Sequence, residues 1–179
     1  MSSSDDELIK RIQDRDPSAF QQVVDQNFQV IAAYLTRMLG SHHEAEDLAQ
    51  EVFIRLWTKA DQWQSGRGKL STWLHRIAHN LCMDHFRKQQ PNMGDEALED
   101  TAGGEEPVDM VSHEEMRQAL GGLITALPER QRSALIMCHY QGMSNREAAD
   151  ILEVSVDALE SLLSRARRTL RQQLSEQEV

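Results

Sequence analysis

The sequence predicts an all-α protein of two small helical domains joined by a flexible acidic linker, and the second domain contains a helix-turn-helix. Helices are indicated because alternating Val, Ile and Thr are scarce, whereas Ala, Leu, Gln, Glu and Arg are plentiful. Of the 179 residues, 40% are hydrophobic and 27% are charged, which is typical of a folded globular chain rather than a disordered one.

The division into domains follows from the charge pattern. The net charge is −10, and residues 94–112 carry seven Asp or Glu and no Lys or Arg, together with three Gly and one Pro. Such a segment cannot build a core, and repulsion among its like charges extends it. We therefore expect a first domain at residues 1–93, a linker at 94–112 and a second domain at 113–179.

Four helical patterns precede the linker, and the first of them is short. Asp16 is the expected N-cap of the second helix, with Pro17 at its first position, and Gly40 is its expected end. Ser41 and Glu44 have the spacing of a capping box at the start of the third. The fourth helix follows a loop that contains two glycines.

Four more helical patterns follow the linker. Ser112 with Glu115, and Ser144 with Glu147, have capping-box spacing at the start of two of these helices. Pro128 is expected to open another, because proline is favoured at the first helical position. These local signals divide the second domain into short helices.

The end of the chain has helix-turn-helix organisation. A short helix at 145–152 is followed by a tight turn at 153–155 and a long last helix that starts at Ser155. Apolar residues recur every three or four positions along the last helix and predict its buried face. The opposite face carries polar residues: Asp157, Glu160, Ser161, Ser164, Arg165 and Arg168.

That polar face suits the major groove of DNA. Small serines permit close approach, and arginines suit phosphates or guanine edges. The alternative is a solvated helix whose arginines complement the negative end of the helix dipole. Asp157 and Glu160 disfavour DNA unless one of them accepts a hydrogen bond from a cytosine amino group.

The first domain combines aromatic and basic residues. Trp57, Trp63 and Trp73 lie within 17 positions. Five basic residues are interleaved with them: Arg55, Lys59, Arg67, Lys69 and Arg76. Single-stranded DNA binding uses rings that stack on bases, each worth about 1–3 kcal/mol, and cations that contact the backbone. We expect Trp63, beside the glycine-flanked loop 65–69, to be an exposed ring, and Trp57 and Trp73 to belong to the core.

Three strings resemble, in order along the chain, the extracytoplasmic-function (ECF) group of the sigma-70 family. They are AEDLAQEVFIRLW (45–57), STWLHRIAHNLCMDHFRK (71–88) and LPERQRSALIMCHYQGMSNREAADILEVSVDALESLLSRARRTLR (127–171). The resemblance implies a cytoplasmic sigma factor that is not an enzyme and needs no cofactor. Its expected partners are core RNA polymerase, promoter DNA and an anti-sigma factor, without membrane insertion.

The resemblance also implies roles for individual residues. Core polymerase binding is implied for Asp47, Leu48, Gln50, Glu51 and Phe53. Recognition of the −10 element is implied for Trp63, Arg67, Lys69, Trp73, Arg76, Asn80, Arg87 and Lys88. Recognition of the −35 element is implied for Ser144, Arg146, Ser155, Asp157, Glu160, Ser161, Ser164, Arg165 and Arg168.

The chain departs from the family pattern in its turn and in a histidine cluster. Glu153 stands where the family commonly has Gly, and it would be strained if the turn needs a positive φ. His75, His79 and Cys82 have i, i+4, i+7 spacing and are weak candidates for metal ligands. The alternative places the histidines on a surface that faces DNA or a partner, with Cys82 and Cys138 as small core residues.

Two other classes of protein remain open at this stage. A stand-alone helix-turn-helix regulator explains the second domain but not the string at 45–57 or the tryptophan cluster. A metal or hydrolytic enzyme could use His75, His79 and Asp84, but it lacks a nucleophile and base at convincing spacing. Two distant cysteines form no disulfide framework, and the polar, acidic start is not expected to be a signal peptide.

Overall fold

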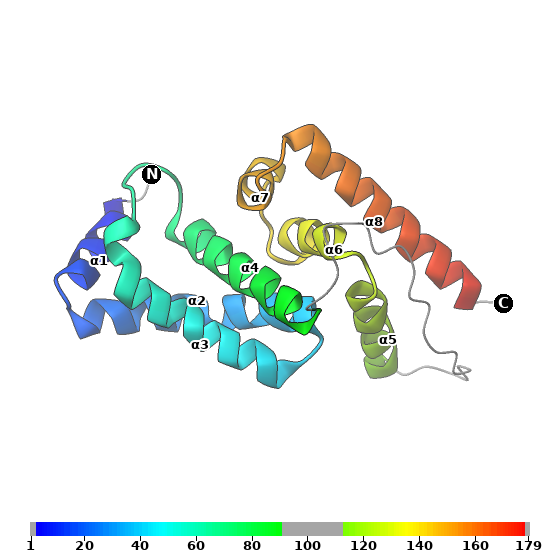
Figure 1. The fold of residues 1–179 in the computed structure, drawn as a ribbon, viewed down its shortest axis with the longest axis horizontal. Coiled ribbons are helices and arrows are strands. Elements are labelled where there is room, and N and C mark those ends of the chain that lie inside the picture. Colours follow the sequence, from blue (N-terminus) through cyan, green and yellow to red (C-terminus); the bar gives the residue numbers. More distant parts are fainter. Residues whose placement is uncertain (1–2, 91–112, 178–179) are drawn as a thin grey trace. The chain divides into compact units, whose positions relative to one another are not determined.

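The computed structural model describes residues 3–90 and 113–177, and in these ranges every regular element is a helix (Figure 1). The predicted all-α class is confirmed. The chain divides into two compact units, residues 1–89 and 90–179. The expected linker at 94–112, and with it Ser112 of one expected capping box, lies outside the described residues. None of the described helices is both long and apolar enough to cross a membrane.

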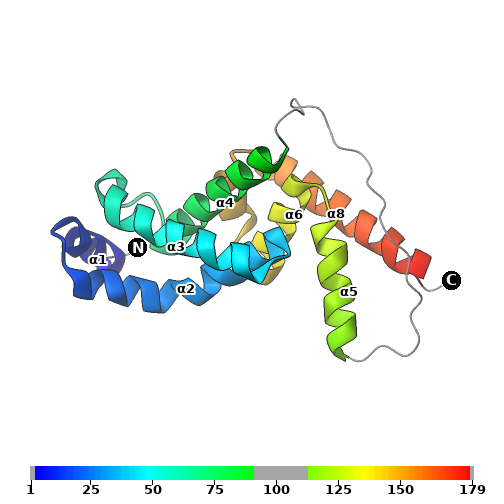
Figure 2. The same ribbon diagram turned by 60° about the horizontal axis from the view of Figure 1, so that its bottom comes forward.

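The first unit is a helical bundle in which the last helix packs against the two before it. Its elements are α1 (Ser3–Gln13), α2 (Pro17–Leu39), α3 (His42–Lys59), the short 3₁₀ helix η1 (Ala60–Gln62) and α4 (Leu70–Gln89). Helices α2 and α3 form an antiparallel pair, and α4 contacts both (Figures 1 and 2). The buried side chains between them include Tyr34, Leu35, Met38, Val52, Leu56, Leu74 and Ala78.

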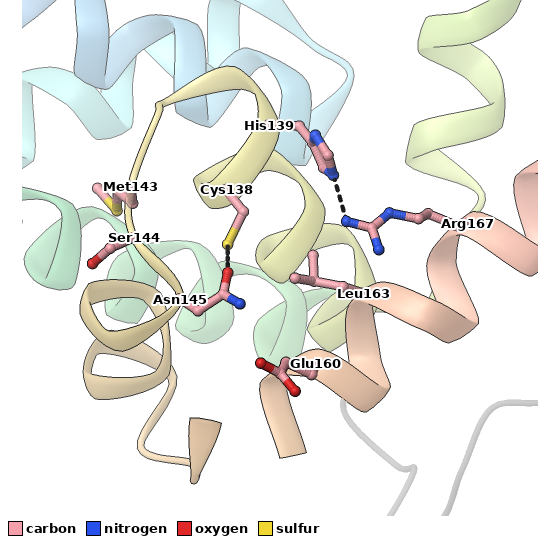
Figure 3. A pocket seen from close by; sticks show the side chains of 8 residues that line it. All are labelled: Cys138, His139, Met143, Ser144, Asn145, Glu160, Leu163 and Arg167. Carbon is pink, nitrogen blue, oxygen red and sulfur yellow. Dashed lines mark hydrogen bonds between the residues drawn. The ribbon is translucent and has the colours of Figure 1, made fainter. Parts of the chain in front are cut away.

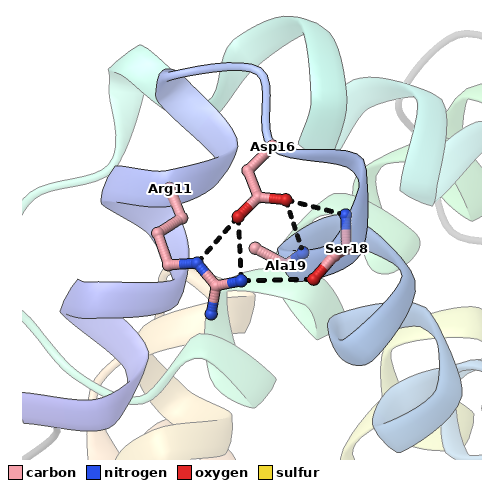
Figure 4. A network of polar contacts seen from close by, with 4 residues as sticks. All are labelled: Arg11, Asp16, Ser18 and Ala19. Atoms are coloured by element: carbon pink, nitrogen blue, oxygen red, sulfur yellow. Dashed lines mark hydrogen bonds and ion pairs between the residues drawn. The ribbon is translucent and has the colours of Figure 1, made fainter.

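The start of α2 confirms the predicted cap. Oδ1 of Asp16 accepts from the backbone N–H of Ser18 at 2.9 Å, and Oδ2 accepts from Nε of Arg11 at 2.9 Å (Figure 4). The hydrogen bonds from Arg11 and from the Ser18 backbone lower the pKa of Asp16 below its ordinary value. At the other end Gly40 has φ 70°, the left-handed conformation that glycine adopts without strain.

The cap of α3 forms only in part. Oγ of Ser41 accepts from the backbone N–H of Glu44 at 3.3 Å, as predicted. The Glu44 carboxylate lies 3.6 Å from Nε2 of His85 on α4 instead of closing the capping box. A tertiary contact has therefore replaced half of the local motif.

The second unit consists of α5 (His113–Thr125), α6 (Glu129–Leu135), the π-helical turn η2 (Ile136–Tyr140), α7 (Asn145–Leu152) and α8 (Val156–Gln177). The predicted capping box of α7 is complete. Oγ of Ser144 accepts from the backbone N–H of Glu147 at 3.2 Å, and the Glu147 carboxylate accepts from the backbone N–H of Ser144 at 2.9 Å. Pro128 precedes the first residue of α6 as its N-cap.

A buried arginine braces the connection from α5 to α6. Arg132 is only 9% exposed, and its guanidinium donates to the carbonyl oxygens of Leu127, at 2.9 Å, and Thr125. Thr125 is the last residue of α5 and Leu127 lies in the connection after it, so both carbonyls take a donor from outside the helix. A side chain of α6 thus stabilises the connection. Helix α8 packs on α6, and Leu159, Leu163 and Ala166 of α8 are buried.

Candidate nucleic-acid interfaces

The three tryptophans of the first unit form two half-buried aromatic pairs. Trp63 meets Trp73 edge to face, with ring centroids 5.6 Å apart. Trp57 meets Phe20 in the same way at 5.2 Å. The expectations are corrected here, because Trp63 is not a free exposed ring and neither Trp57 nor Trp73 is fully buried. Each ring packs against one aromatic partner and is partly open to solvent.

The loop between η1 and α4 presents two cations at its tip. Arg67 and Lys69 are exposed, and Gly66 and Gly68 beside them have φ values of +79° and +135°. Only glycine adopts such angles readily, so the backbone shape of the tip depends on these two residues. A Cβ built on either glycine would meet nothing within 4 Å, so the tip is open.

Helix α4 continues this surface. Trp73, Arg76, Asn80 and Arg87 are spaced by 3, 4 and 7 residues and therefore share one face of the helix. Asn80 and Arg87 are exposed and Arg76 is half-buried. The Arg87 guanidinium donates to the Asp84 carboxylate at 2.8 Å. Lys88 is exposed beside it.

The histidine cluster is buried, so the interpretation that placed His75 and His79 on a surface facing DNA or a partner was wrong. His75 is 3% exposed, His79 7% and Cys82 0%, so the histidines do not face a surface that meets DNA or a partner. Nδ1 of His75 donates to the carbonyl oxygen of Ser71 at 2.7 Å. Within the described ranges no three His, Cys, Asp or Glu side chains gather as metal ligands.

The cysteines differ in burial. Cys82 is a core residue, as expected, whereas Cys138 is only partly buried. Burial nevertheless raises the pKa of the Cys138 thiol, which disfavours the reactive thiolate.

Helix α3 exposes part of the predicted polymerase-binding set. Asp47 and Gln50 are exposed, Leu48 is half-buried, and the half-buried Glu51 carboxylate accepts from Nε of Arg55 at 3.2 Å.

Two residues of α3 need correction. Phe53 is 4% exposed with its ring 5.8 Å from that of Phe28, so it packs inside the unit and presents nothing to a partner. Ile54 was missed, and it is 54% exposed. Its i+7 spacing from Asp47 and i+4 spacing from Gln50, on a common face, is the sequence signal that could have found it.

The polar face of α8 is open along its length. All six residues predicted for it are exposed: Asp157, Glu160, Ser161, Ser164, Arg165 and Arg168. The opposite face is anchored by Leu159, Leu163 and Ala166, which are buried. Arg146, on α7, is also exposed. The helix-turn-helix therefore presents a polar strip from a rigid support.

Several serines of this strip are engaged with the backbone. Oγ of Ser155 accepts from the N–H of Ala158 at 3.1 Å, and Oγ of Ser161 donates to the carbonyl oxygen of Asp157 at 3.1 Å. Ser155 and Ser144 cap the starts of α8 and α7, whereas the Ser161 hydroxyl bonds back to the backbone of its own helix. The arginines are the longest side chains of the strip.

The turn of the helix-turn-helix contains a left-handed glutamate. Glu153 has φ 55° and ψ 44° and ends α7. Its backbone N–H donates to the carbonyl oxygen of Asp150 at 3.3 Å, and that of Val154 donates to Ala149 at 3.0 Å. A residue with a Cβ is strained here by about 1–2 kcal/mol relative to glycine. The turn keeps its left-handed backbone although Glu153 stands where the family commonly has glycine.

A cavity of about 490 Å³ lies between η2, α7 and α8 in the second unit (Figure 3). Its polar side chains contact one another. A guanidinium nitrogen of Arg167 lies 3.0 Å from Nε2 of His139, and Sγ of Cys138 lies 3.7 Å from Oδ1 of Asn145. Glu160 connects the cavity to the polar strip of α8.

Two family models match the chain. Sigma-70 region 2 matches residues 23–91, and Sigma-70, region 4 matches residues 117–170. ECF RNA polymerase sigma factor SigW of Bacillus subtilis is 36% identical over 177 residues, with 93% of this chain and 94% of SigW covered. RNA polymerase sigma-H factor of Pseudomonas aeruginosa is 29% identical over 180 residues, with 93% and 91% covered.

Solved structures agree. The sigma factor RpoE of Bartonella quintana, in complex with the anti-sigma factor NepR, superposes with a TM-score of 0.69 at 26% identity, covering 87% of this chain and 96% of that one. CnrH, in complex with the cytosolic domain of CnrY, shares the fold with a TM-score of 0.71 at 24% identity, covering 96% and 97%.

The matches to both sigma-70 regions and to ECF sigma factors define a transcription initiation factor with two helical units. The chain belongs to the ECF group of the sigma-70 family of RNA polymerase sigma factors. This membership favours a sigma factor over a stand-alone helix-turn-helix regulator, because the matches extend over both units.

Proposed function

We propose that α3 of the first unit docks on core RNA polymerase through Asp47, Leu48, Gln50, Glu51 and Ile54. The proposal is supported by the exposure of Asp47, Gln50 and Ile54 on one face. An exposed isoleucine among carboxylate and amide groups combines an apolar anchor with a polar rim, the usual anatomy of a protein interface. Phe53 lies on the buried side of α3 and stabilises the helix by packing on Phe28.

We infer that the loop 63–69 and one face of α4 hold the opened −10 element. Arg67 and Lys69 stand at an open tip, and the Trp63–Trp73 pair lies at its base. Cations for the backbone beside half-exposed rings for stacking are the two components of single-strand binding. Asn80, Arg87 and Lys88 would extend the contact along α4, with Arg76 between them and the loop.

We infer that α8 reads the −35 element. Arg165 and Arg168 are its longest exposed side chains on the polar strip, and Ser161 and Ser164 permit close approach to the groove. Arg146 would contact a phosphate, and the caps made by Ser144 and Ser155 hold the two helices of the motif in place.

The acidity of the chain fits a factor that works with a large partner. An acidic protein has low affinity for stray DNA, because phosphate contacts supply most non-specific binding. The seven carboxylates at 94–112 would suit an electropositive channel of the polymerase. The chain itself carries out no chemical step, acts in the cytoplasm, and is held in check by an anti-sigma factor. A protein of that kind is bound to RpoE of Bartonella quintana.

The open polar strip of α8 on a packed helix-turn-helix is the observation that carries the proposal. The test is transcription from upstream genomic fragments with purified chain and bacterial core polymerase. Transcripts that require both components, with start sites that share −10 and −35 elements, are the expected result. Failure of the chain to co-elute with core polymerase, with no such transcripts, contradicts it.

A further inference from the structure

Two neighbouring carboxylates of α1 reach the loop between η1 and α4. Oδ1 of Asp6 accepts from Nε1 of Trp63 at 2.8 Å, and Oδ2 of Asp6 accepts from Oγ of Ser65 at 2.6 Å. Oδ2 of Asp5 accepts from the backbone N–H of Leu70 at 3.0 Å. Leu70 begins α4, so its N–H has no partner within its own helix, and Asp5 supplies a cap from another helix.

The C-terminal end of α1 and the turn after it contact the segment that precedes the same loop. Nε2 of Gln13 donates to the carbonyl oxygen of Ala60 at 3.0 Å, and Nη1 of Arg15 donates to that of Trp57 at 2.6 Å. The Arg15 guanidinium also lies 5.4 Å from the Trp57 ring. Helix α1 and the turn after it thus contact the chain before, within and after the loop.

The backbone at Arg15 is left-handed where α1 ends, and the N–H of Asp16 donates to the carbonyl oxygen of Arg11 at 2.9 Å. The φ of Arg15 is 64°, a left-handed angle that residues other than glycine seldom adopt. Such strain persists where surrounding contacts impose it. Here the hydrogen bond to the Trp57 carbonyl and the contact with the Trp57 ring hold the Arg15 side chain in place.

We propose that α1 is a positioning element for promoter opening, in which Asp6 holds the loop 63–69 through Trp63 and Ser65, and Asp5 holds its end through Leu70. The inference rests on the proposed function of the loop. Bonded to Asp6, Nε1 of Trp63 and Oγ of Ser65 are not donors for a base. The loop contacts proposed for DNA come from the exposed Arg67 and Lys69 and from the exposed part of the tryptophan rings.

Positioning matters for this loop because its tip is built from glycines. Gly66 and Gly68 allow many conformations in a loop without anchors, and ordering them at the moment of DNA binding would be unfavourable in entropy. Anchors at Trp63, Ser65 and Leu70 remove that freedom beforehand. The hydrogen bonds from Ser65 and Trp63 lower the pKa of Asp6, so the carboxylate stays ionised at neutral pH.

The test compares Asp6→Ala with Asp6→Asn and with Glu7→Ala, an exposed acid on the same helix, as the control. Ser65→Ala, which removes a single hydrogen bond, serves in case Asp6→Ala does not fold. Hydrogen exchange of residues 63–70 is measured in the free chain. The rate of promoter opening is then measured with core polymerase, alongside Arg67→Ala and the double variant with Asp6→Ala.

We expect Asp6→Ala to speed exchange at residues 63–70 and to slow promoter opening about tenfold, because the charge-assisted hydrogen bonds from Trp63 and Ser65 are both lost. Asp6→Asn should recover most of the rate, because its amide oxygen still accepts from Trp63, and Glu7→Ala should match wild type. In the double variant the two defects should not add, because both act through the same loop.

Unchanged exchange in both Asp6→Ala and Ser65→Ala overturns the inference. It is also overturned if exchange rises and opening stays at the wild-type rate while Arg67→Ala is slow. A different result marks failure of the proposed function. If promoters open at the wild-type rate with both Arg67→Ala and Asp6→Ala although exchange rises, the loop has no role in opening. The positioning of the loop by α1 then has no effect on opening either.

Discussion

Oη of Tyr34 and Nδ1 of His79 share a hydrogen bond of 3.1 Å inside the first unit, joining α2 to α4 across 45 residues of sequence. Tyr34 is fully buried, and its ring also lies edge to face with His75 at 5.6 Å. The residues that suggested a metal site are therefore part of the internal support for the surface of α4.

Tyr34→Phe should lower the free energy of unfolding by about 1–2 kcal/mol, because it removes a buried hydrogen bond and keeps the ring in place. Urea denaturation measures the change. An unchanged free energy of unfolding in Tyr34→Phe would contradict the structural role of the Tyr34 bond.

Arg165→Ala and Arg168→Ala should each weaken promoter binding and reduce the salt dependence by about one phosphate contact. The measurement is the slope of log K against log salt for the chain with core polymerase. Arg167→Ala is the control on the same helix, because the Arg167 guanidinium is turned toward His139. A slope that falls for Arg167→Ala but not for the other two would place the DNA on a different face of α8.

Ile54→Ala and Phe53→Ala should separate binding from stability on adjacent residues of α3. Ile54→Ala should weaken core polymerase binding about tenfold with unchanged stability, because its side chain is exposed in the free chain. Phe53→Ala should instead lower the free energy of unfolding by about 3–5 kcal/mol, because it empties a packed position. Undiminished co-elution of Ile54→Ala with core polymerase would remove this face from the interface.

Local chemistry made much of the fold predictable from sequence. The N-cap at Asp16, the helix end at Gly40 and the capping box of Ser144 with Glu147 each involve residues within a few positions of one another. Such contacts depend on spacing alone, which the sequence displays. The polar strip of α8 was predictable for the same reason, because its period is that of a single helix.

Contacts between distant segments were not predictable in this way. The bond from Trp63 to Asp6 joins residues 57 positions apart, and an amphipathic pattern does not say which neighbour a half-buried ring will meet. His79 was misplaced because helical spacing identifies a shared face without saying whether that face is the core. Phe53 was assigned to a partner surface by resemblance, although its packing on Phe28 belongs to the interior.

Glu153→Gly should stabilise the second unit. Glu153 holds φ 55°, where its Cβ is strained, and glycine adopts this angle freely. The gain is reduced by the greater freedom of glycine in the unfolded chain, so a net increase of about 0.5–1 kcal/mol in unfolding free energy is expected. Glu153→Ala keeps the Cβ and should show no such gain. If both variants match wild type, the turn relaxes without strain. If Glu153→Gly is stabilised but binds the promoter less well, the glutamate side chain contributes to recognition beyond its place in the turn.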